Sequence, residues 1–331
     1  MLRTIHMSSP IKKILVLSSG GDAPGMNAAI RAVVRSALHR GIEVYGCERG
    51  FAGLNDQQLF EFTTNSVANI IQRGGTILKT ARYPEFKSTN IQQRARDFLK
   101  QQSIDGLVVL GGNGSFQGAY HLAKDNDLKV IGIPCTIDCD IVGTEYCIGF
   151  DTACNTAIRA IDNIRDTAQS HDRNFIIEVM GKNSGFLATH VGIATGAELI
   201  LIPEEQLTMQ GICQSLQKTR EKLTHLIVAA EADKPGRSFD LAKAIEAQCN
   251  MSYKVCVLGH IQRGGSPTGR DRVIASLMGA EAVELLLQHK SNRMVAFNNN
   301  QLTDTEFPDP DQATRAFDQQ KALAINTSIC H

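Results

Sequence analysis

The sequence lacks the features that mark membrane and nucleic-acid-binding proteins. Its 34 basic residues are balanced by 34 acidic ones, so it has no net charge to attract a nucleic acid or an anionic membrane. No apolar run approaches the roughly 20 residues of a membrane span, and the first residues lack the apolar core of a secretion signal. With 331 residues, of which 43% are hydrophobic and only 9 are proline, the chain is long enough for two domains. We therefore expect a soluble, cytoplasmic enzyme.

The sequence also lacks a CxxC pair. Its 9 cysteines lie mostly inside apolar runs, as Cys147, Cys154 and Cys256 do. This distribution favours reduced thiols over a zinc knuckle or a disulfide framework.

Short apolar runs that end in glycine-rich or polar turns recur along the chain. The first, residues 12–19, leads into the turn Gly20-Gly-Asp-Ala-Pro-Gly-Met-Asn27 and then into a helical pattern over residues 28–38. Continuous apolar runs separated by helix-length segments predict parallel strands covered on both faces. The predicted fold class is α/β, with two similar three-layer α/β/α lobes, mainly parallel sheets and an active-site cleft between the lobes. Six further runs have this pattern and cover residues 104–110, 129–134, 174–180, 198–203, 224–230 and 254–260.

The turns after these runs are candidate anion sites. Ligands of parallel sheets bind beyond the carboxyl ends of the strands, where the turns lie. Glycine lets the backbone approach a phosphate closely, and the helix that follows offers unpaired N–H groups and the positive end of its dipole. Neither GxGxxG nor GxxxxGK[ST] is present, which disfavours a dinucleotide-binding fold and a P-loop.

An acidic loop is the candidate catalytic centre. The apolar run over residues 131–134 ends in a loop that carries Thr136, Asp138 and Asp140. Two acids separated by one residue share a side of an extended loop. One can then hold a metal ion while the other accepts a proton from the same bound group.

Five motifs, over residues 20–28, 75–86, 134–140, 148–153 and 258–267, carry a family resemblance. In this order, from about Lys12 to Leu287, they resemble the motifs of bacterial-type 6-phosphofructokinases. The resemblance implies phosphoryl transfer from ATP to the 1-hydroxyl of fructose 6-phosphate, the committed step of glycolysis, with Mg²⁺ as the metal. It implies a nucleotide-binding lobe of residues 10–150 plus 262–305. The sugar-phosphate-binding lobe would then be residues 151–261 plus 306–331.

The resemblance also implies roles for individual residues. Asp138 matches the base that accepts the proton of the 1-hydroxyl, and Thr136 and Lys182 match the other catalytic residues. Asn113 and Asp140 match the metal positions. The implied nucleotide-binding residues are Gly21, Arg82, Tyr83, Gly112, Asn113, Gly114 and Ser115. The implied substrate-binding residues are Thr136, Asp138, Arg173, Met180, Gly181, Lys182, Glu231, Lys254, His260 and Arg263.

Five residues bear on assembly and regulation through the same resemblance. Arg173 and Lys254 match positions that reach the 6-phosphate across a subunit contact, which implies a homo-oligomer, usually a tetramer. Arg31, Arg35 and Arg165 match the pocket for the effectors ADP and phosphoenolpyruvate. Other cations common in this pocket are missing, which weakens an anion site. We therefore expect blunted regulation.

The departures from the family pattern lie at or near positions that the resemblance assigns to the active site. Asn113 stands where Asp is usual, and an amide lacks the negative charge that attracts Mg²⁺. Cys135 and Cys139 replace the usual Gly and Asn, and Lys182 and Lys254 replace Arg, which removes its bidentate fork. These changes favour a slow kinase.

Two alternatives to an ATP-dependent kinase stay open. One is a pyrophosphate-dependent fructose 6-phosphate 1-phosphotransferase, and the other is a catalytically weak regulatory paralogue. Gly114 favours ATP, because pyrophosphate-using relatives typically carry Asp there. Cys135 matches neither donor class.

Overall fold

The chain forms two compact units. The computed structural model describes residues 10–123, 127–205, 207–218, 224–232, 234–308 and 319–330. Unit 1 comprises the described residues within Met1–Thr136, Ile141–Gly149 and Ser266–Gln312. Unit 2 comprises those within Ile137–Asp140, Phe150–Gly265 and Ala313–His331.

Unit 1 is built on a seven-stranded sheet with the strand order β11-β10-β5-β4-β1-β2-β3. Strands β2, β1, β4, β5 and β10 are parallel, whereas β3 and β11 pair antiparallel with their neighbours. The central strand β4 is buried at every position, as expected for a parallel strand covered on both faces. The strands are β1 (Lys13–Ser18), β2 (Glu43–Cys47), β3 (Leu59–Glu61), β4 (Gly106–Gly111), β5 (Lys129–Pro134), β10 (Arg293–Asn298) and β11 (Gln301–Glu306).

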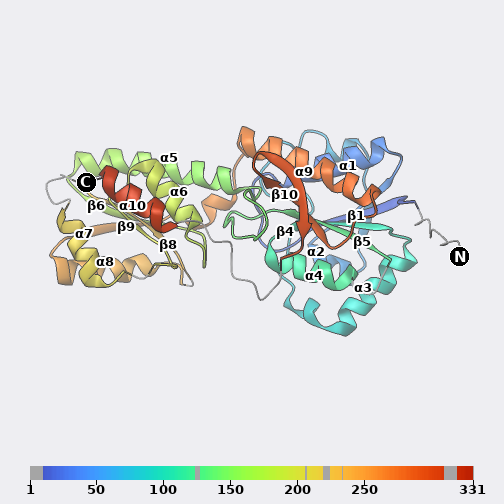
Figure 1. Cartoon of the computed structure of the whole chain (residues 1–331), viewed down its shortest axis with the longest axis horizontal. Helices are drawn as coiled ribbons and strands as arrows, with labels where there is room; N and C mark the ends of the chain where they lie inside the picture. Colours follow the sequence, from blue (N-terminus) through green and yellow to red (C-terminus); the bar gives the residue numbers. More distant parts are fainter. Residues whose placement is uncertain are drawn as a thin grey trace, which may run out of the picture. The chain divides into compact units, whose positions relative to one another are not determined.

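Helices cover both faces of this sheet. Helices α1 (Met26–His39) and α9 (Gly269–Leu287) pack against each other on one face (Figure 1). A Cβ on Gly279 would lie 2.6 Å from the Ala29 carbonyl oxygen, so this glycine allows the two helices to approach closely. The other face is covered by α2 (Gly50–Asn55), α3 (Thr89–Gln101) and α4 (Asn113–Ala123). Unit 1 also contains the short 3₁₀ helices η1 (Asn65–Val67) and η2 (Pro84–Lys87).

Unit 2 repeats this architecture on a smaller scale. Its four-stranded sheet has the order β7-β8-β6-β9, and all its pairings are parallel. The strands are β6 (Asn174–Val179), β7 (Leu199–Leu201), β8 (Leu226–Ala230) and β9 (Tyr253–Val257). Helices α5 (Phe150–Ser170), α6 (Phe186–Thr195) and α10 (Gln319–Cys330) lie on one face, and α7 (Met209–Lys218) and α8 (Arg237–Cys249) lie on the other (Figure 1). The 3₁₀ helix η3 (Gly259–Arg263) follows β9.

The predicted fold class is confirmed, because both sheets are mainly parallel and carry helices on both faces. The seven apolar runs became strands β1, β4, β5, β6, β7, β8 and β9. Part of the predicted sugar-phosphate lobe, residues 309–318, lies outside the described residues.

The prediction of reduced thiols is wrong for one pair of cysteines. A disulfide joins Cys213 of α7 to Cys249 of α8, with a Cα–Cα distance of 5.4 Å. The two residues are 36 positions apart, so their pairing depends on how α7 and α8 pack. No short sequence motif indicates it. Seven other cysteines among the described residues take part in no disulfide, and all but Cys256 are buried.

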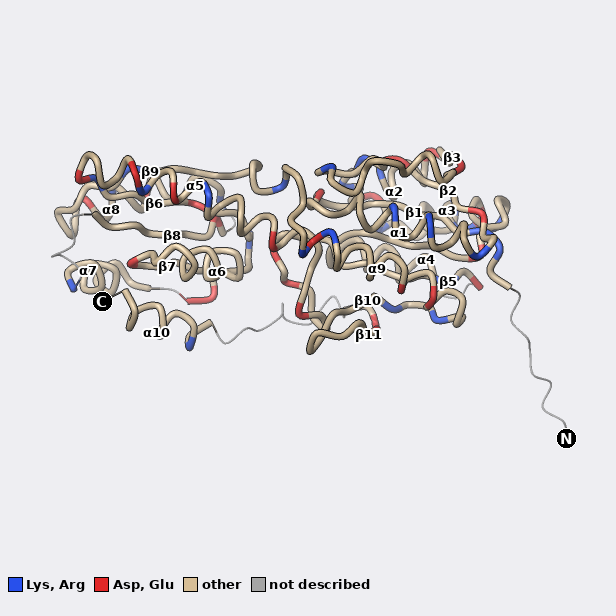
Figure 2. Tube along the Cα trace, turned by 90° about the horizontal axis from the view of Figure 1, so that it is seen from above, with Lys and Arg blue, Asp and Glu red and all other residues tan. Residues whose placement is uncertain are grey.

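Charge is mixed throughout the described chain. Figure 2 shows basic and acidic residues interspersed along both units, in keeping with equal numbers of the two. Within the described ranges, no helix is long and apolar enough to cross a membrane.

Candidate functional site

Three loops of unit 1 meet at the carboxyl edge of its sheet. Strand β4 lies between β5 and β1, so the turns that follow these strands are neighbours. The Ser115 hydroxyl donates to the Ser19 carbonyl oxygen at 3.0 Å, and the Cys135 amide donates to the Gly111 carbonyl oxygen at 2.9 Å. The predicted nucleotide loop, residues 112–115, is thereby fixed beside the glycine turn that follows β1.

Two glycines of the β4–α4 turn have different surroundings. A Cβ on Gly111 would lie 2.5 Å from the Ser115 hydroxyl and 2.6 Å from the Ser19 carbonyl oxygen, so this position requires glycine. A Cβ on Gly114 would meet nothing within 4 Å, and Gly114 is exposed. Helix α4 begins at Asn113, and the Ser115 and Phe116 amides of its first turn donate to the Gly112 carbonyl oxygen at 3.0 and 3.1 Å. Exposed glycine and a helix amino end suit an anionic ligand.

The segment before Arg82 and Tyr83 is attached to the turn after β1. The Thr80 hydroxyl donates to the Gly20 carbonyl oxygen at 2.9 Å, and the Ser18 hydroxyl donates to the Lys79 carbonyl oxygen at 2.8 Å. Arg82 is exposed, and the half-buried Tyr83 packs on Phe86 with ring centroids 6.4 Å apart. Arg82 and Tyr83 therefore follow directly from a segment that is fixed to the glycine turn.

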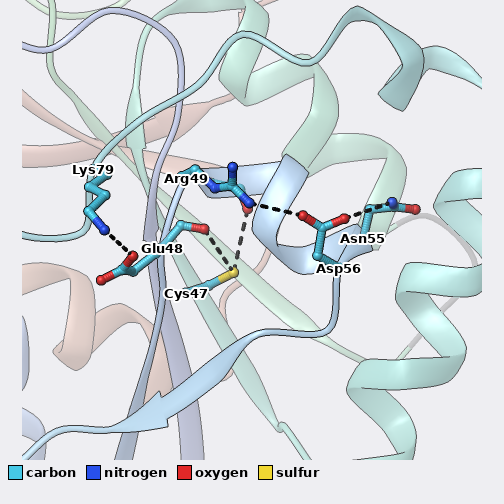
Figure 3. Close-up of polar contacts among 7 residues, drawn as sticks. Cys47, Glu48, Arg49, Asn55, Asp56 and Lys79 are labelled. Carbon is cyan, nitrogen blue, oxygen red and sulfur yellow. Dashed lines mark hydrogen bonds and ion pairs between the residues drawn. The ribbon is translucent and has the colours of Figure 1, made fainter.

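Polar contacts around the β2–α2 turn support this segment (Figure 3). Lys79 pairs with Glu48 at 2.6 Å, and Arg49 pairs with Asp56 at 3.2 Å. These ion pairs are exposed, and such pairs contribute only about 0–1 kcal/mol each. Burial, with Asp56 and Glu48 nearby, raises the pKa of Cys47 to about 12, so its thiol stays neutral.

The loops after β6, β8 and β9 meet at the carboxyl edge of the unit 2 sheet. The Met180 amide donates to Gln262 Oε1 at 2.9 Å, and the Glu231 amide donates to the Val179 carbonyl oxygen at 2.8 Å. Gly181 has φ +136°, and a Cβ there would lie 2.5 Å from the Ser184 carbonyl oxygen. These bonds bring the loop of Met180 and Gly181 next to Glu231 and to η3, which contains His260 and Arg263.

Asp138 lies in a cluster of charged side chains within unit 2. Burial is the largest cause that raises its pKa, to about 6, and the negative charges of Asp140 and Glu231 add to the rise. The positive charges of Arg263 and Lys182 lower it. A carboxylate with this pKa is ionised at neutral pH and is a stronger base than an ordinary aspartate.

Glu231 belongs to the same cluster. Burial raises its pKa, while a hydrogen bond from the Lys182 backbone lowers it. The backbone at Cys139, Lys182 and Ala232 is left-handed, with φ of 51°, 52° and 51°. Non-glycine residues rarely adopt this conformation, and such strain concentrates at functional sites. Three loops of one unit thus combine shifted carboxylates with strained backbone.

Two predicted substrate residues lie at the opposite edge of the unit 2 sheet. Phe175 and Lys254 are paired at the beginnings of β6 and β9, and Arg173 directly precedes β6. Both cations are exposed. Because Met180 follows the far end of β6, a strand of roughly 17–20 Å separates it from Arg173. The structure does not bring Arg173 and Lys254 to the Asp138 cluster of their own unit.

The predicted effector arginines belong to both units. Arg31 and Arg35 are partly exposed and lie four residues apart on α1, so they share a side of the helix. Arg165 of α5 donates to the Thr195 carbonyl oxygen at the end of α6.

Metal-binding groups are sparse. Among the residues that the structure describes, no group of three or more His, Cys, Asp or Glu side chains could hold a metal ion. Asp140 is partly exposed, and its negative charge raises the pKa of Asp138. A cation beside Asp140 would cancel that repulsion. Asp140 is the kind of ligand that suits Mg²⁺, which commonly takes one or two carboxylates together with substrate phosphates.

Gln262 was not singled out from the sequence, although its side chain holds the Met180 amide. Gln262 is fully buried, and in the sequence it lies between two predicted binding residues, His260 and Arg263. Its position inside the motif of residues 258–267 indicates a place near the site, but the motif does not indicate which residue Gln262 contacts.

Comparisons with known proteins agree in naming one family. A family model described as Phosphofructokinase matches residues 13–286. The ATP-dependent 6-phosphofructokinase of Coxiella burnetii is 56% identical, and the match covers 97% of this chain and 98% of that protein. The protein of the same name from Clostridium tetani is 50% identical over 94% of this chain and 97% of its own length.

A solved structure agrees with these relatives. The phosphofructokinase of Saccharomyces cerevisiae is 32% identical, with a TM-score of 0.81 over 96% of this chain. The present chain spans less than half of that longer chain, covering 46% of it.

Proposed function

This chain belongs to the phosphofructokinase family, and we propose that it transfers the terminal phosphoryl group of ATP to the 1-hydroxyl of fructose 6-phosphate. The products are fructose 1,6-bisphosphate and ADP, and the reaction is the committed step of glycolysis. The observation that carries the proposal is Asp138, a carboxylate with a pKa of about 6 placed near Lys182 and Arg263. It unites a base with the cations that phosphoryl transfer needs. These phosphorylated substrates also favour action in the cytoplasm.

Unit 1 is the proposed nucleotide side. Gly21, Gly112, Asn113, Gly114 and Ser115 bind the ATP phosphates, next to the amino end of α4. The exposed Gly114 leaves room for them. Arg82 and the ring of Tyr83 contact the nucleotide next to the glycine turn.

Unit 2 is the proposed sugar-phosphate side. Asp138 accepts the proton of the 1-hydroxyl, and Thr136, which follows β5 of unit 1, orients the hydroxyl and the phosphate. Lys182 and Arg263 offset the negative charge of the transferring phosphoryl group. Such preorganised cations are a large part of catalysis in this kind of reaction. Met180, Gly181, Glu231 and His260 complete the set that binds the sugar phosphate.

Mg²⁺ is the proposed metal, held by Asp140 and the Asn113 side chain together with the ATP phosphates. When bound, it neutralises phosphate charge. An Asn113→Asp variant adds a negative charge that attracts the cation. We expect the Mg²⁺ concentration for half-maximal rate to fall by about threefold or more. An unchanged Mg²⁺ dependence would remove Asn113 from the metal site.

We also propose that the enzyme is a homo-oligomer, a tetramer, in which Arg173 and Lys254 bind the 6-phosphate held by a neighbouring subunit. Their place at the amino edge of the sheet supports this role, because they lie away from Asp138 of their own unit. Arg31, Arg35 and Arg165 form the proposed effector site, with weak responses to ADP and phosphoenolpyruvate.

The experiment that tests the function is a coupled assay of the purified chain with fructose 6-phosphate and Mg²⁺. We expect fructose 1,6-bisphosphate with ATP and at most a trace with pyrophosphate, in keeping with Gly114. Turnover with pyrophosphate alone would replace the proposal by the phosphotransferase alternative. No product from either donor would support a regulatory paralogue.

A further inference from the structure

Ser184 touches three parts of the proposed sugar-phosphate site at once. It is 3% exposed and lies between β6 and α6, and its hydroxyl donates to the Asp138 carbonyl oxygen at 3.0 Å. Its amide donates to the Gly181 carbonyl oxygen at 2.8 Å, which closes the turn that contains Lys182. The Phe186 amide, at the start of α6, approaches the same hydroxyl at 3.4 Å. Ser184 therefore links the loop that contains Asp138 to the turn that contains Lys182 and to the start of α6.

The backbone around these contacts requires support. Cys139, next to Asp138, and Lys182, two residues before Ser184, both have left-handed φ values, of 51° and 52°. Non-glycine residues keep such a conformation only where their surroundings hold it. This part-buried hydroxyl-to-carbonyl bond is a directional restraint, and loss of its donor would leave the Asp138 carbonyl without that bond.

We propose that Ser184 is a positioning residue for the catalytic base. Its hydroxyl holds the Asp138 peptide so that the carboxylate keeps its place relative to Lys182 and Arg263. Ser184 does not touch the substrate and exchanges no proton; it acts only through Asp138 and the turn at Gly181. The inference rests on the proposed function and assigns that site a residue outside the family motifs quoted above.

The test compares Ser184→Ala with Ser184→Thr, because threonine keeps the hydroxyl. Displacing a catalytic group by about 1 Å can lower a rate by up to roughly a hundredfold. We expect kcat of Ser184→Ala to fall by about tenfold to a hundredfold, with KM for fructose 6-phosphate and for ATP within about twofold of the wild type. Ser184→Thr should keep kcat within about threefold of the wild type.

A matched control separates this role from the loss of any buried hydroxyl. Ser238 of α8 is also fully buried in unit 2, and its hydroxyl makes no hydrogen bond among the described residues. Ser238→Ala should therefore leave kcat and both KM values unchanged. Unfolding temperatures of all variants would show how much each fold is weakened.

Each outcome supports or overturns the proposal. It is overturned if Ser184→Ala keeps full kcat, or if this variant loses activity only through a raised KM. It is also overturned if Ser184→Ala and Ser184→Thr reduce kcat equally. Should Ser184→Thr fail to fold, Ser184→Cys replaces it, and this weaker donor must give a kcat between those of the alanine variant and the wild type. Failure of the proposed function is distinct, because the wild type itself would then make no fructose 1,6-bisphosphate.

Discussion

The two units use the same strand–turn–helix architecture but build different chemical surfaces at the carboxyl edges of their sheets. In unit 1 the edge is made of glycines, hydroxyls and the amino end of α4, with Gly114 open and Gly111 tightly packed. In unit 2 the edge contains Asp138 and Glu231, whose pKa values are raised mainly by burial and lowered by nearby cations such as Arg263. Backbone N–H groups suit a ligand that carries its own charge, whereas proton transfer needs titratable side chains.

The units also differ in how they are stabilised. In the described parts of the chain, unit 1 has a seven-stranded sheet, whereas unit 2 has a four-stranded sheet and the Cys213–Cys249 disulfide. The smaller sheet offers less core to its helices, so a covalent link between α7 and α8 adds stability where apolar burial adds less.

The largest expected effect comes from removing the base. Asp138→Asn should lower kcat by roughly a thousandfold, because the amide cannot accept the proton, with smaller changes in KM. The same variant should unfold at a higher temperature near pH 7.5. A raised pKa means that the ionised carboxylate destabilises the fold, and asparagine removes that charge. The stability difference should vanish below about pH 4, where Asp138 is neutral both folded and unfolded. Retention of most of the wild-type kcat would contradict the assignment of the base.

A comparable change in unit 1 should affect binding instead of the chemical step. Gly114→Asp introduces a carboxylate into open space, so the protein should fold normally. We expect KM for ATP to rise by about a hundredfold, because the new charge repels the phosphates. Steady-state kinetics and unfolding temperatures would be measured together. Gly111→Ala is the control: its Cβ would clash 2.6 Å from the Ser19 carbonyl oxygen, so it should lower stability. If Gly114→Asp leaves the KM for ATP unchanged, unit 1 binds the nucleotide elsewhere.

The pH dependence of kcat/KM distinguishes a buried base from an ordinary aspartate. Burial raises the pKa of Asp138 to about 6. The base works when deprotonated, so kcat/KM should be constant above this pH and fall about tenfold per pH unit below it. Assays with fructose 6-phosphate below its KM, between pH 5 and 8, would locate the fall. A rate that stays constant down to about pH 4.5 would indicate a carboxylate of ordinary pKa.

Reduction of the disulfide should give the smallest effect on catalysis. A link that closes a loop of 36 residues contributes on the order of 3–4 kcal/mol in the chain-entropy model. Reductant, or a Cys213→Ser/Cys249→Ser double variant, should therefore lower the unfolding temperature while kcat changes by less than about twofold. A Cys330→Ser variant, which alters a buried cysteine outside the disulfide, is the control. An unchanged unfolding temperature in the double variant would show that α7 and α8 need no link.

The sequence predicted those features that depend on neighbouring residues. Apolar runs located strand β4 and the other central strands, because a strand buried on both faces must be apolar throughout. The predicted first helix, residues 28–38, agrees with α1. Features that depend on packing between distant segments were missed. The Cys213–Cys249 pair and the Ser184–Asp138 bond, which spans 46 residues, have no local pattern. Likewise, residues 137–140 group with unit 2 although they follow a strand of unit 1.

Arg173 and Lys254 at the amino edge of the unit 2 sheet have a consequence for how activity arises. Under the proposed sharing of sites, each subunit provides Arg173 and Lys254 to the 6-phosphate bound by a neighbouring subunit. Its own site receives the same two residues from another subunit. On this proposal a folded monomer would lack two of the cations that bind the 6-phosphate, and it would bind the sugar phosphate weakly. Dilution that separates the subunits would then lower the activity, so assembly would act as a checkpoint between synthesis and sugar consumption.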